Sequence, residues 1–364
     1  MSVKITGVGM YVPPNVWTNR KLAAELLKRR EDLINQKKFI TPEQRERFET
    51  SDEWIRERTG IRERHIANPE EATSDMAIKA AQNAMRKANL NPTDTEFLIV
   101  ATVSPDHLFS PPTAAIVQSK LGLSTDTFIS DVSVACSSFV CALAIGFSLI
   151  KSGVYKRGVV IGADTMSRNV NWNDRTFSVI MADGAGALVL ERSNETPFIQ
   201  RPFLFGSDGN LAPLICTPTG GSRQPFSPET MKTVIENPVF QSHTATMNGR
   251  ELLKLMARLV PEKIKEAVER ADLKWSDLDL FIPHQANLRI IDAIKKRLEK
   301  YPGFRAKVFI NIDRYGNTTS ASIPICIYEA LEQGLLKSGS KIMLVGFGGG
   351  ISWGTVTFKW PILG

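Results

Sequence analysis

Residues 131–139 read Asp131-Val132-Ser133-Val134-Ala135-Cys136-Ser137-Ser138-Phe139. The run begins like a strand, breaks at small residues and continues into an apolar stretch that ends at Ile150. That stretch is too short to span a bilayer, so we expect a buried helix. Cys136 would then lie at a strand-to-helix junction, where unpaired N–H groups and the helix dipole favour the nucleophilic thiolate over the thiol.

Two later segments have the same setting, because each follows a strand-like stretch and precedes a helical one. They are Pro283-His284-Gln285-Ala286-Asn287 and Tyr315-Gly316-Asn317-Thr318-Thr319. Alone, each residue has an ordinary structural interpretation: a core cysteine, a buried histidine and a turn or capping asparagine. A Cys, a His and an Asn on three such junctions together indicate a covalent active site.

The chain also contains an internal repeat. One unit runs from the strand at 97–100 through the Cys136 junction, and the other runs from 280–282 through the Asn317 junction. Their helices end alike, at 149–153 and 335–339, and a Gly-rich turn with a β-rich segment follows each. Strands alternating with helices in two similar halves predict α/β layers with pseudo-twofold symmetry. That symmetry would bring both junctions to one central site.

We divide the chain into an N-terminal half, residues 1–195, and a C-terminal half, residues 196–364. Two segments look like peripheral insertions. Residues 22–50 are charged and predicted to be helical, with Thr41-Pro42-Glu43 as a new helix start. Residues 217–245 are rich in Pro, Gly, Ser and Thr, which predicts a long surface loop.

Composition narrows the class of protein. The 364 residues are 43% hydrophobic, enough for a large core, and the net charge of +7 suggests anionic partners without choosing among them. The sequence has no stripe of basic and aromatic residues of the kind that binds nucleic acid. The four cysteines lack the spacing of a metal site or a disulfide framework, and the N-terminus lacks a signal-peptide pattern. We therefore expect a soluble, cytoplasmic protein with no metal and no membrane partner.

Six motifs in order along the whole chain resemble β-ketoacyl-acyl carrier protein synthase III, of the thiolase fold. The resemblance implies duplicated halves in five layers, α-β-α-β-α, and a homodimer. It also implies condensation of an acyl-CoA starter with malonyl-acyl carrier protein to initiate fatty acid synthesis, without a cofactor. The motifs are Ser51-Asp52-Glu53-Trp54-Ile55, Arg58-Thr59-Gly60-Ile61-Arg62-Glu63-Arg64, Ala135-Cys136, His284-Gln285-Ala286-Asn287-Leu288-Arg289-Ile290, Gly316-Asn317-Thr318 and Gly346-Phe347-Gly348-Gly349-Gly350.

The histidine count favours this branch over its relatives. Only four histidines occur, and only His284 lies in a junction motif. The related elongating ketosynthases carry a Cys-His-His set, but in this sequence Asn317 stands at the position of their second histidine. Thiolases add a second cysteine near the C-terminal Gly-rich turn, which this sequence does not have.

The resemblance also implies the catalytic roles. Cys136 would be acylated, and its N–H together with that of Gly349 would form the oxyanion hole, since glycine lets the backbone approach closely. His284 Nε2 and the Asn317 amide would both donate to the carbonyl of the malonyl thioester. They would thereby stabilise the enolate that forms as CO₂ leaves.

Binding residues follow from the same resemblance. For CoA, Trp54 and Arg175 would sandwich the adenine, because an indole face and a planar guanidinium suit stacking. Gly249 and Asn287 would line the pantetheine tunnel, and Phe109 or a residue beside it would close the acyl pocket of the dimer partner. The acidic carrier protein would dock on basic residues at Lys254, Arg289, Lys296 and Arg297.

The other candidate residues are predicted to have structural roles. We expect Cys141 to pack in the core and Asp183 to brace a turn. His65, His107 and His243 lack a partner motif and are predicted to be structural or on the surface.

One departure from the family pattern is Ser137-Ser138, where Ala-Gly is usual. These hydroxyls could reshape the acyl pocket or bond to nearby backbone, so acetyl, branched, longer and aryl starters all stay open. A specialised relative could condense a longer or aryl starter for a secondary metabolite, or act as an acyltransferase. The His284–Asn317 pair argues against a pure acyltransferase, and the intact Cys136 against a non-enzymatic scaffold.

Overall fold

Two sheets of mixed strands form the framework of the computed structural model, which describes residues 2–36, 38, 40–194, 201–237, 239 and 241–360. Within these residues each sheet has five strands. The first sheet has the order β1 (Ser2–Tyr11), β7 (Asp183–Ser193), β6 (Arg157–Thr165), β4 (Phe97–Ala101) and β5 (Phe128–Val132). The second has the order β12 (Lys307–Val308), β11 (Leu280–Pro283), β13 (Lys341–Gly348), β14 (Ser352–Lys359) and β8 (Phe203–Ser207).

The two sheets have the same topology. In the first, β5, β4 and β6 are parallel, and β7 and then β1 join antiparallel. In the second, β12, β11 and β13 are parallel, and β14 and then β8 join antiparallel. Because the matching strands also follow in the same order along the chain, the internal repeat is confirmed.

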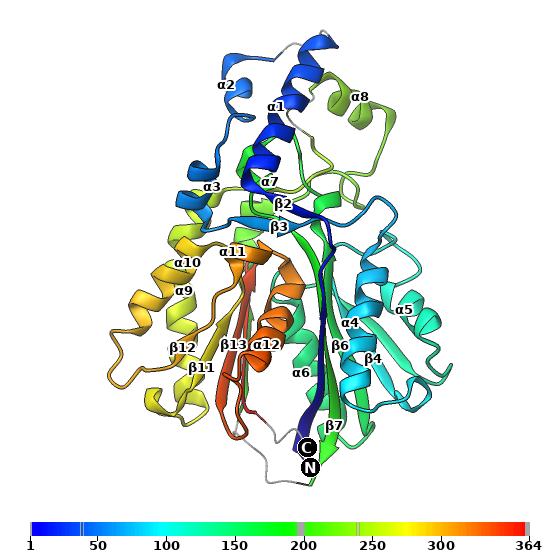
Figure 1. Ribbon diagram of the computed structural model, residues 1–364, viewed down its shortest axis with the longest axis vertical. Coiled ribbons are helices and arrows are strands. Elements are labelled where there is room, and N and C mark those ends of the chain that lie inside the picture. The colour runs from blue at the N-terminus through cyan, green and yellow to red at the C-terminus, as the bar shows by residue number, and fades with distance from the viewer. Residues whose placement is uncertain are drawn as a thin grey trace.

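Helices form the other three layers (Figure 1). Between the sheets lie α6 (Ser138–Lys151) and α12 (Ser322–Glu332), whose apolar side chains share one buried cluster with both sheets. A second buried cluster joins α4 (Thr73–Lys87) and α5 (Thr113–Leu121) to the outer face of the first sheet. A third joins α9 (Gly249–Arg270) and α10 (Leu288–Leu298) to the second sheet. The five-layer thiolase arrangement is therefore confirmed.

Strand β4 illustrates why the central strands are apolar throughout. All five of its residues, from Phe97 to Ala101, are completely buried, because helices cover both faces of the sheet. Burial of each large apolar side chain contributes about 1.5–3 kcal/mol to stability. The absence of polar alternation in this strand is thus a consequence of the layered fold.

The first insertion has the predicted helices, α1 (Asn19–Asn35) and α2 (Pro42–Glu46). Thr41 Oγ1 accepts from the Gln44 N–H at 3.2 Å, and the Gln44 side chain accepts from the Thr41 N–H at 3.0 Å. This reciprocal capping box begins α2 where the sequence predicted a helix start.

The second insertion was only partly predicted, because a helix, α8 (Pro228–Glu236), interrupts the expected loop at 217–245. Ser227 and Thr230 form a capping box of the same kind, with bonds of 3.2 and 2.8 Å. The Ser227-Pro228-Glu229 sequence is the signal that reveals this helix, and it matches the start of α2.

Besides short 3-10 helices, the described chain contains three further α-helices and two small sheets. They are α3 (Asp52–Thr59), α7 (Arg175–Ser178), α11 (Ile312–Tyr315) and two small sheets, β2 (Val16–Thr18) with β3 (Glu63–His65) and β9 (Ile215–Cys216) with β10 (Thr246–Met247). The expected boundary at residues 195 and 196 lies outside the described residues. No helix among the residues described above has the length and apolar character needed to cross a membrane.

Candidate active site

A single cavity of about 1500 Å³ is lined by Cys136, His284 and Asn317. Cys136 precedes α6, His284 follows β11, and Asn317 follows α11. The fold thus brings together the three junctions that the sequence singled out.

The turn that carries Cys136 is held by short-range hydrogen bonds. Ala135 has a positive φ of 48°, a conformation that non-glycine residues rarely adopt. The Ser138 hydroxyl accepts from the Val134 N–H at 2.8 Å and donates to the Ala135 carbonyl at 2.6 Å. These bonds stabilise the unusual backbone beside the thiol.

The two serines after Cys136 bond to their neighbours and do not line the cavity. Ser138 supports the turn, and Ser137 Oγ lies 3.2 Å from the hydroxyl of Ser352. Ser352 also donates to the Gly349 carbonyl at 3.0 Å. The Ser137–Ser352 contact therefore links the nucleophile turn to the Gly-rich turn.

Gly348 makes room for the thiol. A Cβ atom there would lie 2.7 Å from Cys136 Cβ and 2.8 Å from its Sγ, closer than real atoms approach. From the sequence a role was expected for Gly349 and not for Gly348. The N–H groups of Cys136 and Gly349 both lower the pKa of the thiol, which supports the two donors expected in the oxyanion hole.

The helix start does not make Cys136 a thiolate in the free protein. Burial and then the carboxylate of Asp164 raise the pKa of the Cys136 thiol to about 12, against the two N–H groups. Loss of hydration and the Asp164 charge therefore oppose the effect that was expected from the helix start.

His284 is a neutral, buried imidazole. Burial lowers the pKa of His284 to about 3, and its Nε2 atom has no hydrogen-bond partner among the described residues. Its Nδ1 lies 2.7 Å from Ser322 Oγ, which also lies 2.9 Å from the Thr319 carbonyl. When the Ser322 hydroxyl donates to Nδ1, the imidazole proton is on Nε2, the donor state that the resemblance implies.

Asn317 is held by both halves of the chain. Its N–H donates to the Ile180 carbonyl at 2.9 Å, and its own carbonyl accepts from the Ala182 N–H at 3.0 Å. The side-chain oxygen accepts from the Thr319 N–H at 2.9 Å, which fixes the orientation of the amide. Its NH₂ group is therefore left as the donor for the cavity.

Asp164 is a buried carboxylate whose role was not predicted from the sequence. Its two oxygens accept hydrogen bonds from both halves of the chain, and this links the loop after β4 to the turn before α12. The donors are Thr102 Oγ1 at 2.9 Å, the Val103 N–H at 2.7 Å, the Ser104 N–H at 3.1 Å, the Ser104 hydroxyl at 2.8 Å, the Thr319 hydroxyl and the Ser320 N–H at 2.8 Å.

Three of the four residues expected to contact CoA line the cavity: Trp54, Gly249 and Asn287. The fourth, Arg175, lies beside it with its guanidinium 4.6 Å from the centre of the Trp54 ring. The Asn287 amide is already engaged, because it caps α10 at the Arg289 N–H (2.9 Å) and donates to the Arg58 carbonyl (3.1 Å).

The expected carrier-protein dock is split between the cavity rim and α10. Lys254 and Arg289 are exposed and line the cavity, whereas Lys296 and Arg297 are exposed farther along α10. In the loop before α5, Leu108 lines the cavity and Phe109 does not. Phe109 is 83% exposed, so its ring has almost no cover within the described chain.

Of the remaining candidate residues, some line the cavity and others have only structural contacts. His243 lines the cavity, and Cys216 is a second, exposed thiol there. Asp183 braces a turn as predicted, accepting from the Ala67 N–H at 2.7 Å and the Ser167 hydroxyl at 2.6 Å. His65 stacks on Tyr315, His107 is exposed, and Cys141 lies in α6. Among the described residues no group of His, Cys, Asp and Glu is suited to a metal ion.

Comparison with known proteins gives one consistent result. Residues 130–209 match the family described as 3-oxoacyl-[acyl-carrier-protein (ACP)] synthase III, and residues 268–360 match its C-terminal part. Proteins named beta-ketoacyl-[acyl-carrier-protein] synthase III are similar to the chain. One from Caldanaerobacter subterraneus subsp. tengcongensis is 42% identical over 98% of this chain and 97% of its own, and one from Clostridioides difficile is 44% identical over 86% and 92%. The crystal structure of 3-oxoacyl-[acyl-carrier-protein] synthase III from Aquifex aeolicus matches with a TM-score of 0.81 and 38% identity, covering 99% of this chain and 100% of that one.

Proposed function

The chain belongs to the 3-oxoacyl-[acyl-carrier-protein] synthase III family, and we propose that it condenses an acyl-CoA starter with malonyl-acyl carrier protein to begin a fatty acid. The observation that carries this proposal is the meeting of Cys136, His284 and Asn317 in one cavity. The turns that carry Cys136 and Gly349 supply backbone N–H donors, and the side chains of His284 and Asn317 supply neutral donors. These groups suit two successive half-reactions at one site.

In the first half-reaction the Cys136 sulfur attacks the thioester carbonyl. Because the pKa of the thiol is about 12, its proton leaves as the new carbon–sulfur bond forms, and the departing CoA sulfur gains a proton in return. The carbonyl oxygen becomes an oxyanion that accepts from the N–H groups of Cys136 and Gly349. Loss of one such donor typically slows a reaction by about 10²–10³-fold.

In the second half-reaction the malonyl thioester carbonyl accepts hydrogen bonds from His284 Nε2 and the Asn317 NH₂. The bond to the malonyl carboxylate breaks, CO₂ departs, and the electron pair forms an enolate held by these donors. The enolate carbon then attacks the acyl group on Cys136, and the thiolate that leaves regains a proton. A neutral imidazole fits this role, because it donates without giving up its proton.

Partners follow from the exposed groups around the cavity. Lys254, Arg289, Lys296 and Arg297 would attract the acidic carrier protein, and electrostatic attraction speeds such encounters. The exposed Leu108 and Phe109 would be covered in a homodimer. The thiol, imidazole and amide complete the chemistry without a cofactor.

The test separates the two half-reactions. His284→Ala and Asn317→Ala should still form the acyl-enzyme, but condensation should fall about 10²–10³-fold because an enolate donor is lost. Acyl-enzyme is measured by mass spectrometry, and condensation by release of CO₂ from malonyl-carrier protein together with product formation. Normal condensation by either variant would show that the assigned roles are wrong.

A further inference from the structure

Helix α2, part of the insertion at residues 22–50, holds the guanidinium of Arg175. Arg175 Nη2 forms an ion pair with Glu46 Oε1 at 2.9 Å, and Nη1 donates to the Glu49 carbonyl. The Arg175 N–H also donates to the Arg47 carbonyl at 2.8 Å. The Arg175 side chain is only 17% exposed, whereas that of Glu46 is 68% exposed. The insertion therefore determines where this guanidinium lies.

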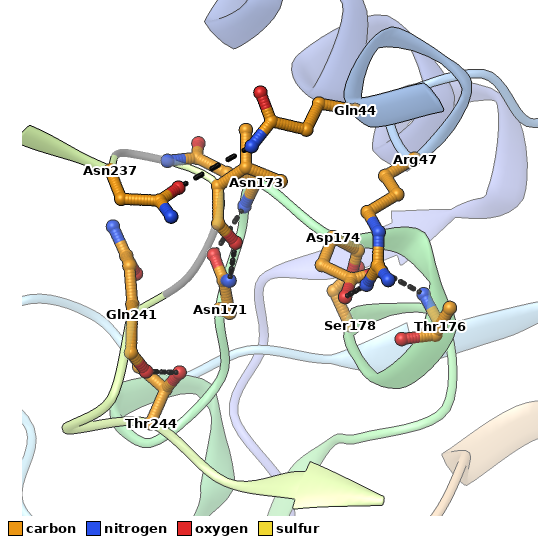
Figure 2. A network of polar contacts seen from close by, with 11 residues as sticks. Gln44, Arg47, Asn171, Asn173, Asp174, Thr176, Ser178, Asn237, Gln241 and Thr244 are labelled. Carbon is orange, nitrogen blue, oxygen red and sulfur yellow. Dashed lines mark hydrogen bonds and ion pairs between the residues drawn. The ribbon is translucent and has the colours of Figure 1, made fainter. Parts of the chain in front are cut away.

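Both insertions fix the position of α2 (Figure 2). Arg47 forms an ion pair with Asp174, and the Gln44 amide donates to the Asn237 side chain at 3.5 Å. The completely buried Phe48 ring packs with Ile40 and Val239. The Arg47–Asp174 pair thus holds α2 against the segment that carries Arg175, and the contacts between the two insertions support that position.

This placement closes the gap between Arg175 and Trp54. The Arg175 guanidinium carbon lies 4.6 Å from the centre of the Trp54 ring. A base stacked between two planes needs about 7 Å, twice a van der Waals contact of about 3.5 Å. An adenine does not fit between these side chains as they lie, and a movement of Arg175 that admits it breaks the ion pair with Glu46.

We propose that Glu46 is a specificity-determining residue, which competes with the adenine of CoA for Arg175 and so weakens the binding of nucleotide-bearing thioesters. This inference rests on the proposed function, because it requires an acyl-CoA substrate whose adenine lies at Trp54. A pantetheine thioester has no nucleotide, so it reaches Cys136 with the Glu46–Arg175 pair intact. The carboxylate of Glu46 also repels the phosphates of CoA, which adds to the discrimination.

Calorimetric titration of free CoA and free pantetheine into the wild-type protein and Glu46→Gln tests this competition. Removal of an exposed ion-pair partner should tighten CoA binding by about two- to fivefold, the range expected for such pairs. Pantetheine affinity should not change. Glu31→Gln, which removes the same charge from an exposed position on α1, should bind both ligands like the wild type.

Unchanged CoA affinity in Glu46→Gln would overturn the inference, as would an equal gain for pantetheine or for CoA in Glu31→Gln. The proposed function is tested separately, by formation of the acyl adduct on Cys136 in each protein. An adduct in every variant with no selective gain for CoA would overturn the inference alone. Absence of any adduct would instead count against the proposed function.

Discussion

The turns before α6 and α12 are built alike and do different things. Cys136 lies two residues before α6, and Ser320 lies two residues before α12. The preceding residues, Ala135 and Thr319, have positive φ values of 48° and 44°. In each turn the hydroxyl of a serine three residues later lies against the carbonyl of that residue, at 2.6 Å for Ser138 and 2.9 Å for Ser322. The backbone of the repeat therefore produces the same turn twice.

The two turns differ in what the neighbouring strand places against them. At the end of β13, Gly348 leaves space beside the Cys136 sulfur. Near the end of β6, Asp164 accepts from the Thr319 hydroxyl and the Ser320 N–H. A glycine at one turn keeps a cavity open for substrate, whereas a carboxylate at the other joins the halves. A duplicated fold can thus carry a single reactive thiol, since one copy of the turn serves as structure.

Among substitutions that test the difference between the two turns, the largest effect is expected from Gly348→Ala. The added methyl group would overlap the Cys136 side chain, and a misplacement of about 1 Å can lower a rate by about 10²-fold. Acylation should therefore fall by about that factor, measured as the rate of acyl adduct formation.

Gly349→Ala is the matched control for this substitution. Its Cβ would lie 3.3 Å from Ala135 Cβ, and the N–H donor would be kept. We expect a much smaller loss of acylation. Equal rates for wild type and Gly348→Ala would contradict the idea that this glycine creates the reactive turn.

Asp164→Asn should destabilise the other turn. An amide would point two N–H donors toward groups that now donate to the carboxylate, and leaving such a buried donor unpaired costs about 1–3 kcal/mol. The free energy of unfolding, from urea titration, should fall by that amount. Asp183→Asn, where the donors come from Ala67 and Ser167, should cost less. A stable Asp164→Asn protein would show that the second turn does not depend on the carboxylate.

The smallest effect concerns the ionisation of the free thiol. Because the pKa of Cys136 is raised to about 12, its alkylation by iodoacetamide should increase about tenfold per pH unit through pH 10. The raised pKa also makes the free energy of unfolding depend on pH. The contribution of the protonated Cys136 thiol is fully present below pH 9 and is lost as the pH rises from 9 toward 12. Peptide mapping separates Cys136 from Cys216. If the alkylation rate of Cys136 instead stopped rising below pH 8, the thiol would have the low pKa that the helix dipole favours.

Local sequence signals predicted much of this structure, and contacts between distant segments account for what was missed. The start of α2 at Thr41 and the junctions at Cys136, His284 and Asn317 could be read from a few adjacent residues. Asp164 could not, because its partners lie in 102–104 and 319–320, which only the folded halves bring together. The helix α8 was missed although Ser227-Pro228-Glu229 carries a start signal, because the Pro, Gly, Ser and Thr content of its segment favoured a loop.

The ionisation of Cys136 was missed for a different physical reason. The helix dipole can be inferred from sequence, but the degree of burial and the nearby Asp164 charge depend on the completed fold. His243 shows the same limit, since nothing beside it in the sequence indicates that it lines the cavity.

Intact-mass spectrometry after incubation with acyl-CoAs, from acetyl to long-chain and aryl, shows directly which thiol is acylated. Wild-type protein, Cys136→Ala and Cys216→Ala should be compared, because both thiols line the cavity. We predict one acyl adduct on the wild type and on Cys216→Ala, and none on Cys136→Ala. An adduct that persists in Cys136→Ala and disappears in Cys216→Ala would show that Cys216, and not Cys136, is the nucleophile.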